Sequence, residues 1–386
     1  MGQTTLIRGA SVVTPTGILP ETSILVEGEK ISTIRKAAEK PTGAKEIDAQ
    51  GLMALPGFID VHIQGTMGRD VWEEEDEALV EMCRGLVRFG TTSFVATTHY
   101  TPSIVQRINR VMQRPTGGAN ILGIHLETPF VSEERRGAIP TERLEPPSRA
   151  KLDEILTECA GNLRIFTLAP ELPGALELFP ELLQAGVIIS LGHTDATYEE
   201  AQRAIALGAS HVTHLFNAMR PFYHREPGVI GAIFDAPEVS VQIIADGVHL
   251  HPATLRLAFA LKGREKIALI TDAVRGAGID QKVFLSSSIR RRVEVKEGAP
   301  RLSTGQIAGS ILTMDKAVKN IQDFVGASLV DAAFMASTTP ARILKLDQKI
   351  GSIELGKDAD IVLMNEAGEV QMTLIKGEVV YDARKN

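Results

Sequence analysis

Six residues that can bind a metal ion or transfer a proton stand at the ends of short apolar segments of this chain. They are His62, Glu127, His193, His214, Asp246 and Asp272. A divalent metal that activates water for hydrolysis needs about three protein ligands and one open position. Glu127, His193 and His214 can supply a carboxylate oxygen and two imidazole nitrogens, so they form the candidate metal site. Asp272 is the candidate general base, which takes a proton from the water and hands it to a leaving amine.

Each of these residues also has a purely structural interpretation. A single strand-end histidine is more often a hydrogen-bonded structural residue than a ligand, and Asp272 alone could be a helix N-cap. Their joint occurrence favours the metal site, because a buried carboxylate and buried imidazoles without a partner would be costly.

The segments that carry these residues predict how they come together. Eight near-continuous apolar runs alternate with helical patterns, which is typical of parallel strands buried on both faces. The runs are 58–62, 91–97, 121–127, 164–168, 187–193, 211–214, 241–246 and 267–272. The pattern predicts a (β/α)8 TIM barrel, in which active sites collect at the carboxyl ends of the strands. The six residues should therefore meet at one mouth of the barrel.

The two ends of the chain differ from its middle. Residues 1–54 and 346–386 contain short alternating runs broken by Gly and Pro turns. Neither end alone has enough strands for a stable sheet, so we expect both to form one small β-sandwich beside a barrel of residues 55–345. Residues 283–302 resemble a hairpin inserted after the eighth strand.

Composition excludes several classes of function. The chain has 386 residues, of which 44% are apolar, and its 41 Lys and Arg stand against 48 Asp and Glu. This balance gives no basic surface for nucleic acid. The two cysteines make no disulfide framework, and no apolar stretch reaches the roughly 20 residues that cross a bilayer. We expect a cytoplasmic protein with no nucleic-acid or membrane partner.

Several phrases of the sequence resemble one known family. They are residues 56–62 (PGFIDVH), 125–130 (HLETPF), 191–197 (LGHTDAT), 213–219 (THLFNAM), 225–231 (REPGVIG), 244–249 (IADGVH), 269–273 (LITDA) and 307–310 (IAGS). In this order they closely resemble the N-acetylglucosamine-6-phosphate deacetylase family of the amidohydrolase superfamily. The resemblance implies a homodimeric enzyme that holds one divalent metal, zinc or ferrous iron, and deacetylates N-acetylglucosamine 6-phosphate.

The resemblance also implies roles for individual residues. It places the metal ligands on Glu127, His193 and His214 and the general acid/base on Asp272, in agreement with the chemistry of the strand ends. The family's substrate contacts fall on Asn217, Ala218, Arg225, Asp246, His249, Ile307, Ala308, Gly309, Ala138 and Ile139. Arg225 offers a fork that matches phosphate oxygens, in a loop whose composition also suits a subunit contact. His249 should polarise the scissile carbonyl or hold a hydroxyl.

Four positions depart from the family pattern. Thr128 replaces the glycine that usually follows the ligand glutamate. Gln64 stands where many amidohydrolases have the second histidine of His-x-His, so any second metal site at His62 should be weak or empty. Ile139 stands where the family has a histidine, and His99 is a histidine that the family pattern does not explain, best interpreted as lining the mouth. Two alternatives stay open: an amidohydrolase for a different N-acyl amino sugar or amide, or a non-catalytic scaffold barrel.

Overall fold

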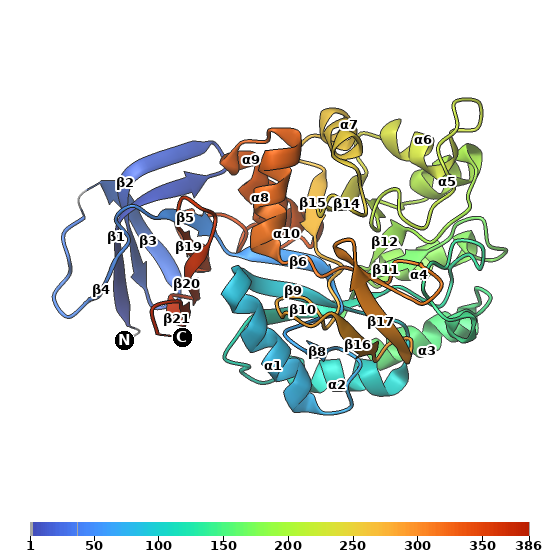
Figure 1. The fold of residues 1–386 in the computed structure, drawn as a ribbon, viewed down its shortest axis with the longest axis horizontal. Helices are drawn as coiled ribbons and strands as arrows, with labels where there is room; N and C mark the ends of the chain where they lie inside the picture. The colour runs from blue at the N-terminus through green and yellow to red at the C-terminus, as the bar shows by residue number, and fades with distance from the viewer. Residues whose placement is uncertain (1–2, 37, 386) are drawn as a thin grey trace.

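The computed structural model describes residues 3–36 and 38–385. Within them a (β/α)8 barrel lies beside a β domain, as Figure 1 shows. The barrel strands are β6 (Phe58–Ile63), β9 (Thr91–Thr98), β10 (Asn120–Leu126), β11 (Leu163–Leu168), β12 (Ile188–Leu191), β13 (His211–Val212), β14 (Ser240–Ile244) and β15 (Ile267–Ile270). Each pairs in parallel with the next in chain order. The Asp272 amide donates to the His62 carbonyl oxygen at 2.8 Å, which joins β15 to β6 and closes the ring.

Burial on both faces is why these strands were predictable from apolar runs. Every residue of β6 and of β9 is buried. All eight predicted strands are confirmed, although β12 to β15 end earlier than predicted. The backbone leaves the sheet there and turns into the loops that carry His193, His214, Asp246 and Asp272. These residues therefore lie just beyond the strands, at the carboxyl end of the barrel.

Helices surround the barrel in the part of the chain that the structure describes. They are α1 (Asp76–Leu86), α2 (Pro102–Met112), α3 (Arg149–Cys159), α4 (Phe179–Gln184), α5 (Tyr198–Ala206), α6 (Gly228–Phe234), α7 (Pro252–Lys262), α8 (Met314–Val325), α9 (Leu329–Ala333) and α10 (Thr339–Ile343). A capping box starts α5, where the Glu200 carboxylate accepts from the Thr197 amide at 2.8 Å and the Thr197 hydroxyl accepts from the Glu200 amide at 3.2 Å. No helix among the described residues combines the length and the hydropathy needed to span a bilayer.

The two termini share one β domain. Its strands are β1 (Thr4–Thr14), β2 (Gly17–Glu27), β3 (Lys30–Lys36), β4 (Lys45–Asp48), β5 (Met53–Pro56), β19 (Ile361–Met364), β20 (Val370–Ile375) and β21 (Glu378–Asp382). The antiparallel pairing of β5 with β19 joins the amino-terminal strands to the carboxyl-terminal strands in one branched sheet with a core of its own. The expected joining of both termini in a β unit is confirmed. The domain boundaries near residues 54 and 346 stay a prediction.

A small antiparallel sheet lies over the barrel mouth. Its strands are β16 (Val283–Ser286), β17 (Arg291–Lys296) and β18 (Ala299–Arg301), which confirms the predicted hairpin insertion. Phe284 and Val293 bury their side chains against Val274, which follows β15, and Ala138 packs against the same cluster. The insertion is therefore anchored to the loops that surround the site. A second, two-stranded hairpin, β7 (Gly65–Thr66) and β8 (Arg69–Asp70), follows β6.

Candidate metal centre and active site

A cavity of about 190 Å³ opens where the barrel strands end. Its lining comprises Gln64, His99, Glu127, Gly137, Ala138, Ile139, His193, His214, Asn217, Ala218, His249, Asp272, Val274, Ser286, Ser288, Ile289, Ile307, Ala308 and Gly309. All three candidate metal ligands, the candidate base and most of the predicted substrate contacts lie in this one cavity. Segments far apart in the sequence meet here because the carboxyl ends of parallel barrel strands share one face.

The three candidate ligands point their donor atoms at one another. The Glu127 Oε1 atom lies 3.2 Å from His193 Nε2 and 3.3 Å from His214 Nε2, and the two imidazole nitrogens are 3.0 Å apart. His193 Nδ1 donates to the Arg135 carbonyl oxygen at 2.9 Å, which turns Nε2, the nitrogen that a metal would bind, toward the cluster. Burial lowers the pKa of His214, which favours the neutral ring that a metal ligand needs. This buried oxygen and nitrogen set fits a divalent cation.

The backbone is strained where these side chains emerge. His193, His214, Ala218 and Asp272 have φ angles of 48°, 30°, 50° and 47°. Such angles are uncommon outside glycine, and each costs of order 1–3 kcal/mol. All four residues line the cavity. The fold thus holds its reactive side chains in turns that local preference alone would not choose.

Asp272 shares its surroundings with Gln64 and His62. The Gln64 Nε2 amide donates to Asp272 Oδ1 at 3.1 Å and to Glu127 Oε2 at 3.4 Å. His62 is fully buried below the cavity, with Nε2 at 3.3 Å from Asp272 Oδ1 and 3.4 Å from Glu127 Oε1. The amide hydrogens of Gln64 therefore face the two carboxylates that a second cation would need. This supports the expectation that a second site at His62 is weak.

Beneath the cavity, a chain of hydrogen bonds fixes the ring of His62. Ser240 Oγ donates to the Ser210 carbonyl and accepts from His211 Nδ1 at 2.7 Å, so His211 Nε2 is the acceptor for the Gln242 amide at 3.1 Å. The Gln242 Oε1 atom then accepts from His62 Nδ1 at 2.9 Å, which turns His62 Nε2 toward Glu127 and Asp272. Burial opposes a charge on His62, but these two carboxylates raise the pKa of its ring well above the ordinary value. Only a weak hint of this role is visible in the sequence, where Gln242 is a polar residue inside the apolar run of β14.

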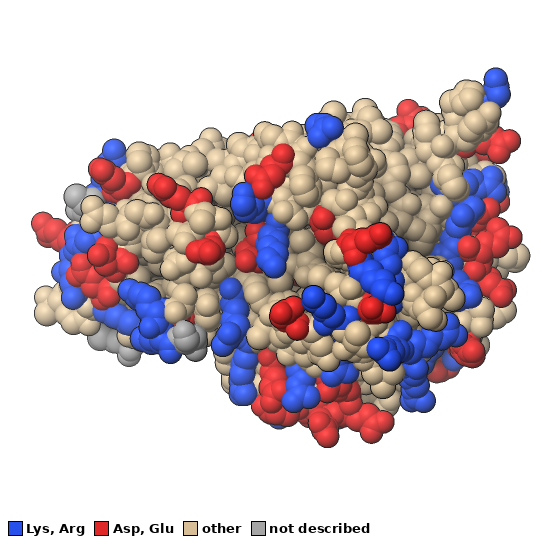
Figure 2. Space-filling model, in the orientation of Figure 1, with Lys and Arg blue, Asp and Glu red and all other residues tan. Residues whose placement is uncertain are grey.

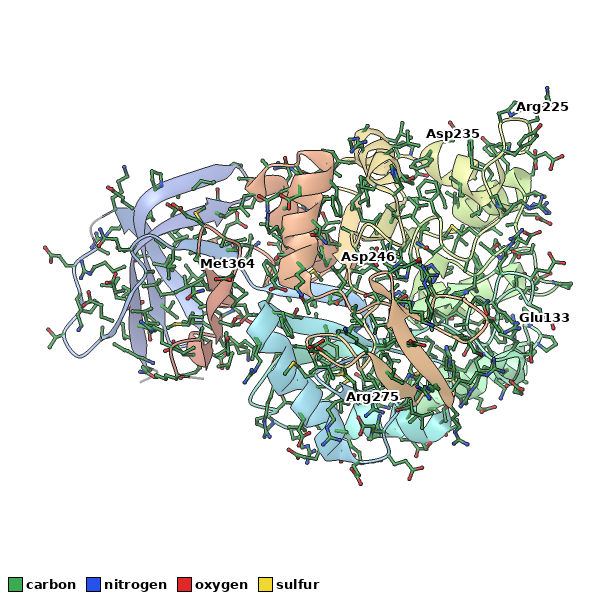
Figure 3. All side chains as sticks on the ribbon, in the orientation of Figure 1. Glu133, Arg225, Asp235, Asp246, Arg275 and Met364 are labelled. Carbon is green, nitrogen blue, oxygen red and sulfur yellow. The ribbon has the colours of Figure 1, made fainter. Side chains whose placement is uncertain are left out.

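Two predicted substrate contacts lie outside this cavity. Asp246 stands behind His249: its Oδ2 accepts from His249 Nδ1 at 2.6 Å and its Oδ1 accepts from the Val248 and His249 amides. Burial opposes ionisation of Asp246, but the hydrogen bonds from His249 and Val248 and the charge of His249 together outweigh burial and lower the pKa of Asp246. Asp246 therefore positions His249 instead of lining the pocket. Arg225 lies exposed at the tip of a projecting loop, far from Asp246 in Figure 3, and donates to the Tyr223 hydroxyl at 3.1 Å.

Comparisons with known proteins place the chain in a family. The family model described as "Amidohydrolase family" matches residues 53–380. An N-acetylglucosamine-6-phosphate deacetylase of Bacillus subtilis (strain 168) is 36% identical, over 100% of this chain and 99% of its own. The chain belongs to the N-acetylglucosamine-6-phosphate deacetylase family of amidohydrolases.

Other members of the family support the same placement. An N-acetylgalactosamine-6-phosphate deacetylase of Escherichia coli O157:H7 is 33% identical, with 97% of this chain and 99% of its own covered. The crystal structure of the N-acetylglucosamine-6-phosphate deacetylase from Pasteurella multocida superimposes with a TM-score of 0.91 at 32% identity, over 97% of this chain and 99% of that one. A mutant of the deacetylase from Mycobacterium smegmatis, solved in complex with N-acetyl-D-glucosamine-6-phosphate, gives a TM-score of 0.90 at 30% identity, over 98% of this chain and 100% of that one.

Three of the four departures from the pattern of this deacetylase family lie in the cavity, and Thr128 is not among its lining residues. Gln64, His99 and Ile139 line it, so the expectation that His99 belongs to the mouth is confirmed. Sequence reasoning missed the wall that the inserted sheet provides through Ser286, Ser288 and Ile289. An insertion's local composition does not indicate which face of the barrel it covers, and only the packing of Phe284 against the loop after β15 decides this.

Proposed function

We propose that this chain is a metal-dependent hydrolase that converts N-acetylglucosamine 6-phosphate to glucosamine 6-phosphate and acetate. The observation that carries the proposal is the convergence of Glu127, His193 and His214 with Asp272 in one cavity of a chain that belongs to this deacetylase family. A non-catalytic scaffold would not need this complete set of buried donors in one cavity.

The metal ligands in this proposal are Glu127, His193 and His214, and the ion is zinc or ferrous iron. When bound, the ion supplies Lewis-acid chemistry that makes a water molecule acidic and polarises the amide carbonyl. Asp272 accepts the proton of the attacking water on a carboxylate oxygen and delivers it to the nitrogen of the leaving amine. The Gln64 amide holds Asp272 Oδ1 at 3.1 Å and orients the carboxylate for this transfer.

The sugar is held by the walls on the side of β13, β14 and β15. His249 Nδ1 donates a hydrogen bond to Asp246 Oδ2, so the His249 Nε2 atom is available to a sugar hydroxyl or to the scissile carbonyl. Gly309 lies against the Asp272 backbone with a φ of 69°, and a Cβ there would come within 2.6 Å of Val274. This position lets the backbone of Ile307, Ala308 and Gly309 approach the sugar closely.

Arg225 binds the substrate phosphate in this proposal, and it does so in the cavity of a second subunit of a homodimer. Its exposed place at a loop tip supports a contact outside its own subunit. A hollow of about 600 Å³ beside the same loop is lined by apolar side chains, among them Phe222, Leu257 and Leu261, with exposures of 56%, 50% and 52%. Charged residues are sparse over α6 and α7 in Figure 2, as a subunit interface requires. Sedimentation of a Leu257→Glu, Leu261→Glu variant should show monomers, while Leu355→Glu on an exposed loop should leave dimers.

The proposed compartment is the cytoplasm. Cys83 and Cys159 are both buried free thiols, which supports a reducing environment.

Acetate release from three purified substrates tests the proposed function. Metal-loaded enzyme should act on N-acetylglucosamine 6-phosphate with a far higher kcat/KM than on unphosphorylated N-acetylglucosamine. Arg225→Ala should raise KM much more than it lowers kcat if ground and transition states hold the phosphate equally. Arg35→Ala, on an exposed strand of the β domain, is the matched control. Equal rates on both sugars would remove the phosphate assignment, and no acetate from any of them would remove the deacetylase assignment.

N-Acetylgalactosamine 6-phosphate is the third substrate of that panel. Ile139 provides an alkyl wall where the family pattern has a polar histidine, and one curated relative is named for the galactosamine substrate. A higher kcat/KM for this sugar would move the assignment to it without changing the reaction.

A further inference from the structure

His99 closes the cavity on the side away from the predicted sugar contacts. It follows β9, and β9 lies across the barrel from β13, because the strands follow one another around the ring from β6 to β15. The loop after β13 carries Asn217 and Ala218, and His249 follows the neighbouring β14. The loop of Gly137 crosses toward this same side, since a Cβ at Gly137 would lie 3.6 Å from His193 and 3.9 Å from Ala218.

The direction of the substrate amide follows from Asp272. This carboxylate must reach the leaving nitrogen, and the sugar is attached to that nitrogen, so the sugar lies on the Asp272 and His249 side. The acyl carbon stands on the other side of the scissile bond and carries the acyl chain away from the sugar. His99 forms the cavity wall there, and it stands next to the ligand Glu127, whose amide donates to the Thr98 carbonyl oxygen at 3.0 Å.

The ring of His99 is held by packing from behind. Its centroid lies 4.8 Å from that of Trp72 at an interplanar angle of 59°. The Arg143 guanidinium carbon lies 5.8 Å from the centroid of the Trp72 ring. Arg143 is itself fixed by a 2.8 Å bond to the Thr101 hydroxyl. His99 Nδ1 is buried and finds no hydrogen-bond partner among the described residues. The position of the His99 ring is therefore set by its packing against Trp72 and not by a hydrogen bond at Nδ1. Burial lowers the pKa of His99 to about 4, which keeps this wall uncharged.

We propose that His99, backed by Trp72, is the specificity-determining wall of the acyl subsite and restricts the enzyme to short acyl groups such as acetyl. This inference rests on the proposed deacetylase function and names the part of the site that selects the acyl group. A longer acyl chain would have to displace the His99 ring, which Trp72 supports from behind, and Arg143 in turn lies over Trp72. One extra methylene in such a closed pocket changes kcat/KM by about 10- to 200-fold.

The test compares N-acetyl with N-propanoyl and N-butanoyl glucosamine 6-phosphate. Wild-type enzyme should disfavour the N-propanoyl substrate by about tenfold or more in kcat/KM. His99→Ala and the more conservative His99→Val should each raise the propanoyl-to-acetyl ratio at least about tenfold. Ile139→Ala enlarges the sugar side of the same cavity and is the matched control, in which that ratio should stay within about twofold. Unchanged ratios in both His99 variants would overturn the inference.

A second measurement does not depend on turnover. Trp72 is the sole tryptophan of the chain, so its emission reports on the stack directly. In His99→Ala the emission should shift to longer wavelength as water reaches the indole, and added butanoate should reverse the shift by filling the space. If butanoate leaves the Trp72 emission of the folded His99→Ala variant unchanged, this result counts against an acyl subsite at Trp72. If the wild-type enzyme releases acetate but the His99 variants leave the propanoyl-to-acetyl ratio unaltered, only the role of His99 is refuted. If the wild-type enzyme acts on no N-acyl sugar, the proposed function is refuted as well.

Discussion

Replacing Gln242 should destabilise the protein from beneath its active site. The Gln242 side chain donates to His211 Nε2 at 3.1 Å and accepts from His62 Nδ1 at 2.9 Å and from the His214 amide at 3.3 Å. Gln242→Met conserves the shape but leaves these three fully buried polar groups without their partner. Each unsatisfied buried group costs about 1–3 kcal/mol, so the free energy of unfolding should fall by at least about 3 kcal/mol. The same bonds hold the rings of His62 and His211 in place, so the variant should loosen both rings.

Urea unfolding of the metal-free protein, followed by Trp72 emission, measures this loss. Gln242→Glu is the informative companion, because a carboxylate keeps the acceptor for His62 and His214 and loses only the donor to His211. Its loss of stability should be smaller than that of Gln242→Met and should shrink further at lower pH as His211 becomes able to donate. A Gln242→Met protein within about 1 kcal/mol of wild type, below the cost of a single unpaired buried group, would refute the hydrogen-bond chain.

The remaining predictions concern the metal, the base, the buried histidines and the sugar wall. Elemental analysis should find about one divalent metal per chain, and Gln64→His should raise this toward two by giving His62 a partner; two slowly lost metals in wild type would contradict it. Asp272→Asn should keep fold and metal but lose at least about 10²-fold in kcat, and a variant above about a tenth of the wild-type rate would move the role elsewhere. Burial lowers the pKa of His211 to about 3. Below about pH 6.5 this histidine therefore binds a proton in the unfolded chain but stays neutral in the folded chain. The contribution of His211 to the free energy of unfolding should thus be fully present above about pH 6.5 and should fall by about 2 kcal/mol on going to pH 5. Urea titrations at several pH values measure this fall, and His211→Gln should reduce it. Ile139→His should improve kcat/KM for N-acetylglucosamine 6-phosphate about tenfold by pairing a sugar hydroxyl, and no change would show that the lost contact is silent.

The barrel and its reactive residues were predictable because they leave local signals. A strand buried on both faces must be apolar along its whole length, as β9 is, so eight such runs predict the barrel. Ligands at the ends of these runs must meet, since parallel strands place their carboxyl ends on one face. The position of a residue at a strand end is therefore enough to predict the metal ligands and the base, which are Glu127, His193, His214 and Asp272. The ordered motifs added the family, which the comparisons confirm.

Other features of the site depend on contacts that carry no local signal. Asp246 and His249 were both expected at the substrate, but a 2.6 Å bond puts one behind the other. Arg225 was expected at a phosphate, but it is not among the lining residues of its own cavity and lies far from Asp246 in Figure 3. A loop's direction depends on what packs against it, which sequence-local patterns do not record.

The sequence by itself determined which residues have the chemistry and which strands bring them to one mouth, because both follow from side-chain type and from burial along a strand. Only the tertiary structure decided how that chemistry is arranged. The proton positions along Ser240, His211, Gln242 and His62 depend on hydrogen bonds between different strands. The stack of His99 on Trp72 joins the end of β9 to the segment after β8, and no periodicity links the two. Such contacts are long-range packing outcomes, fixed only when the whole barrel closes.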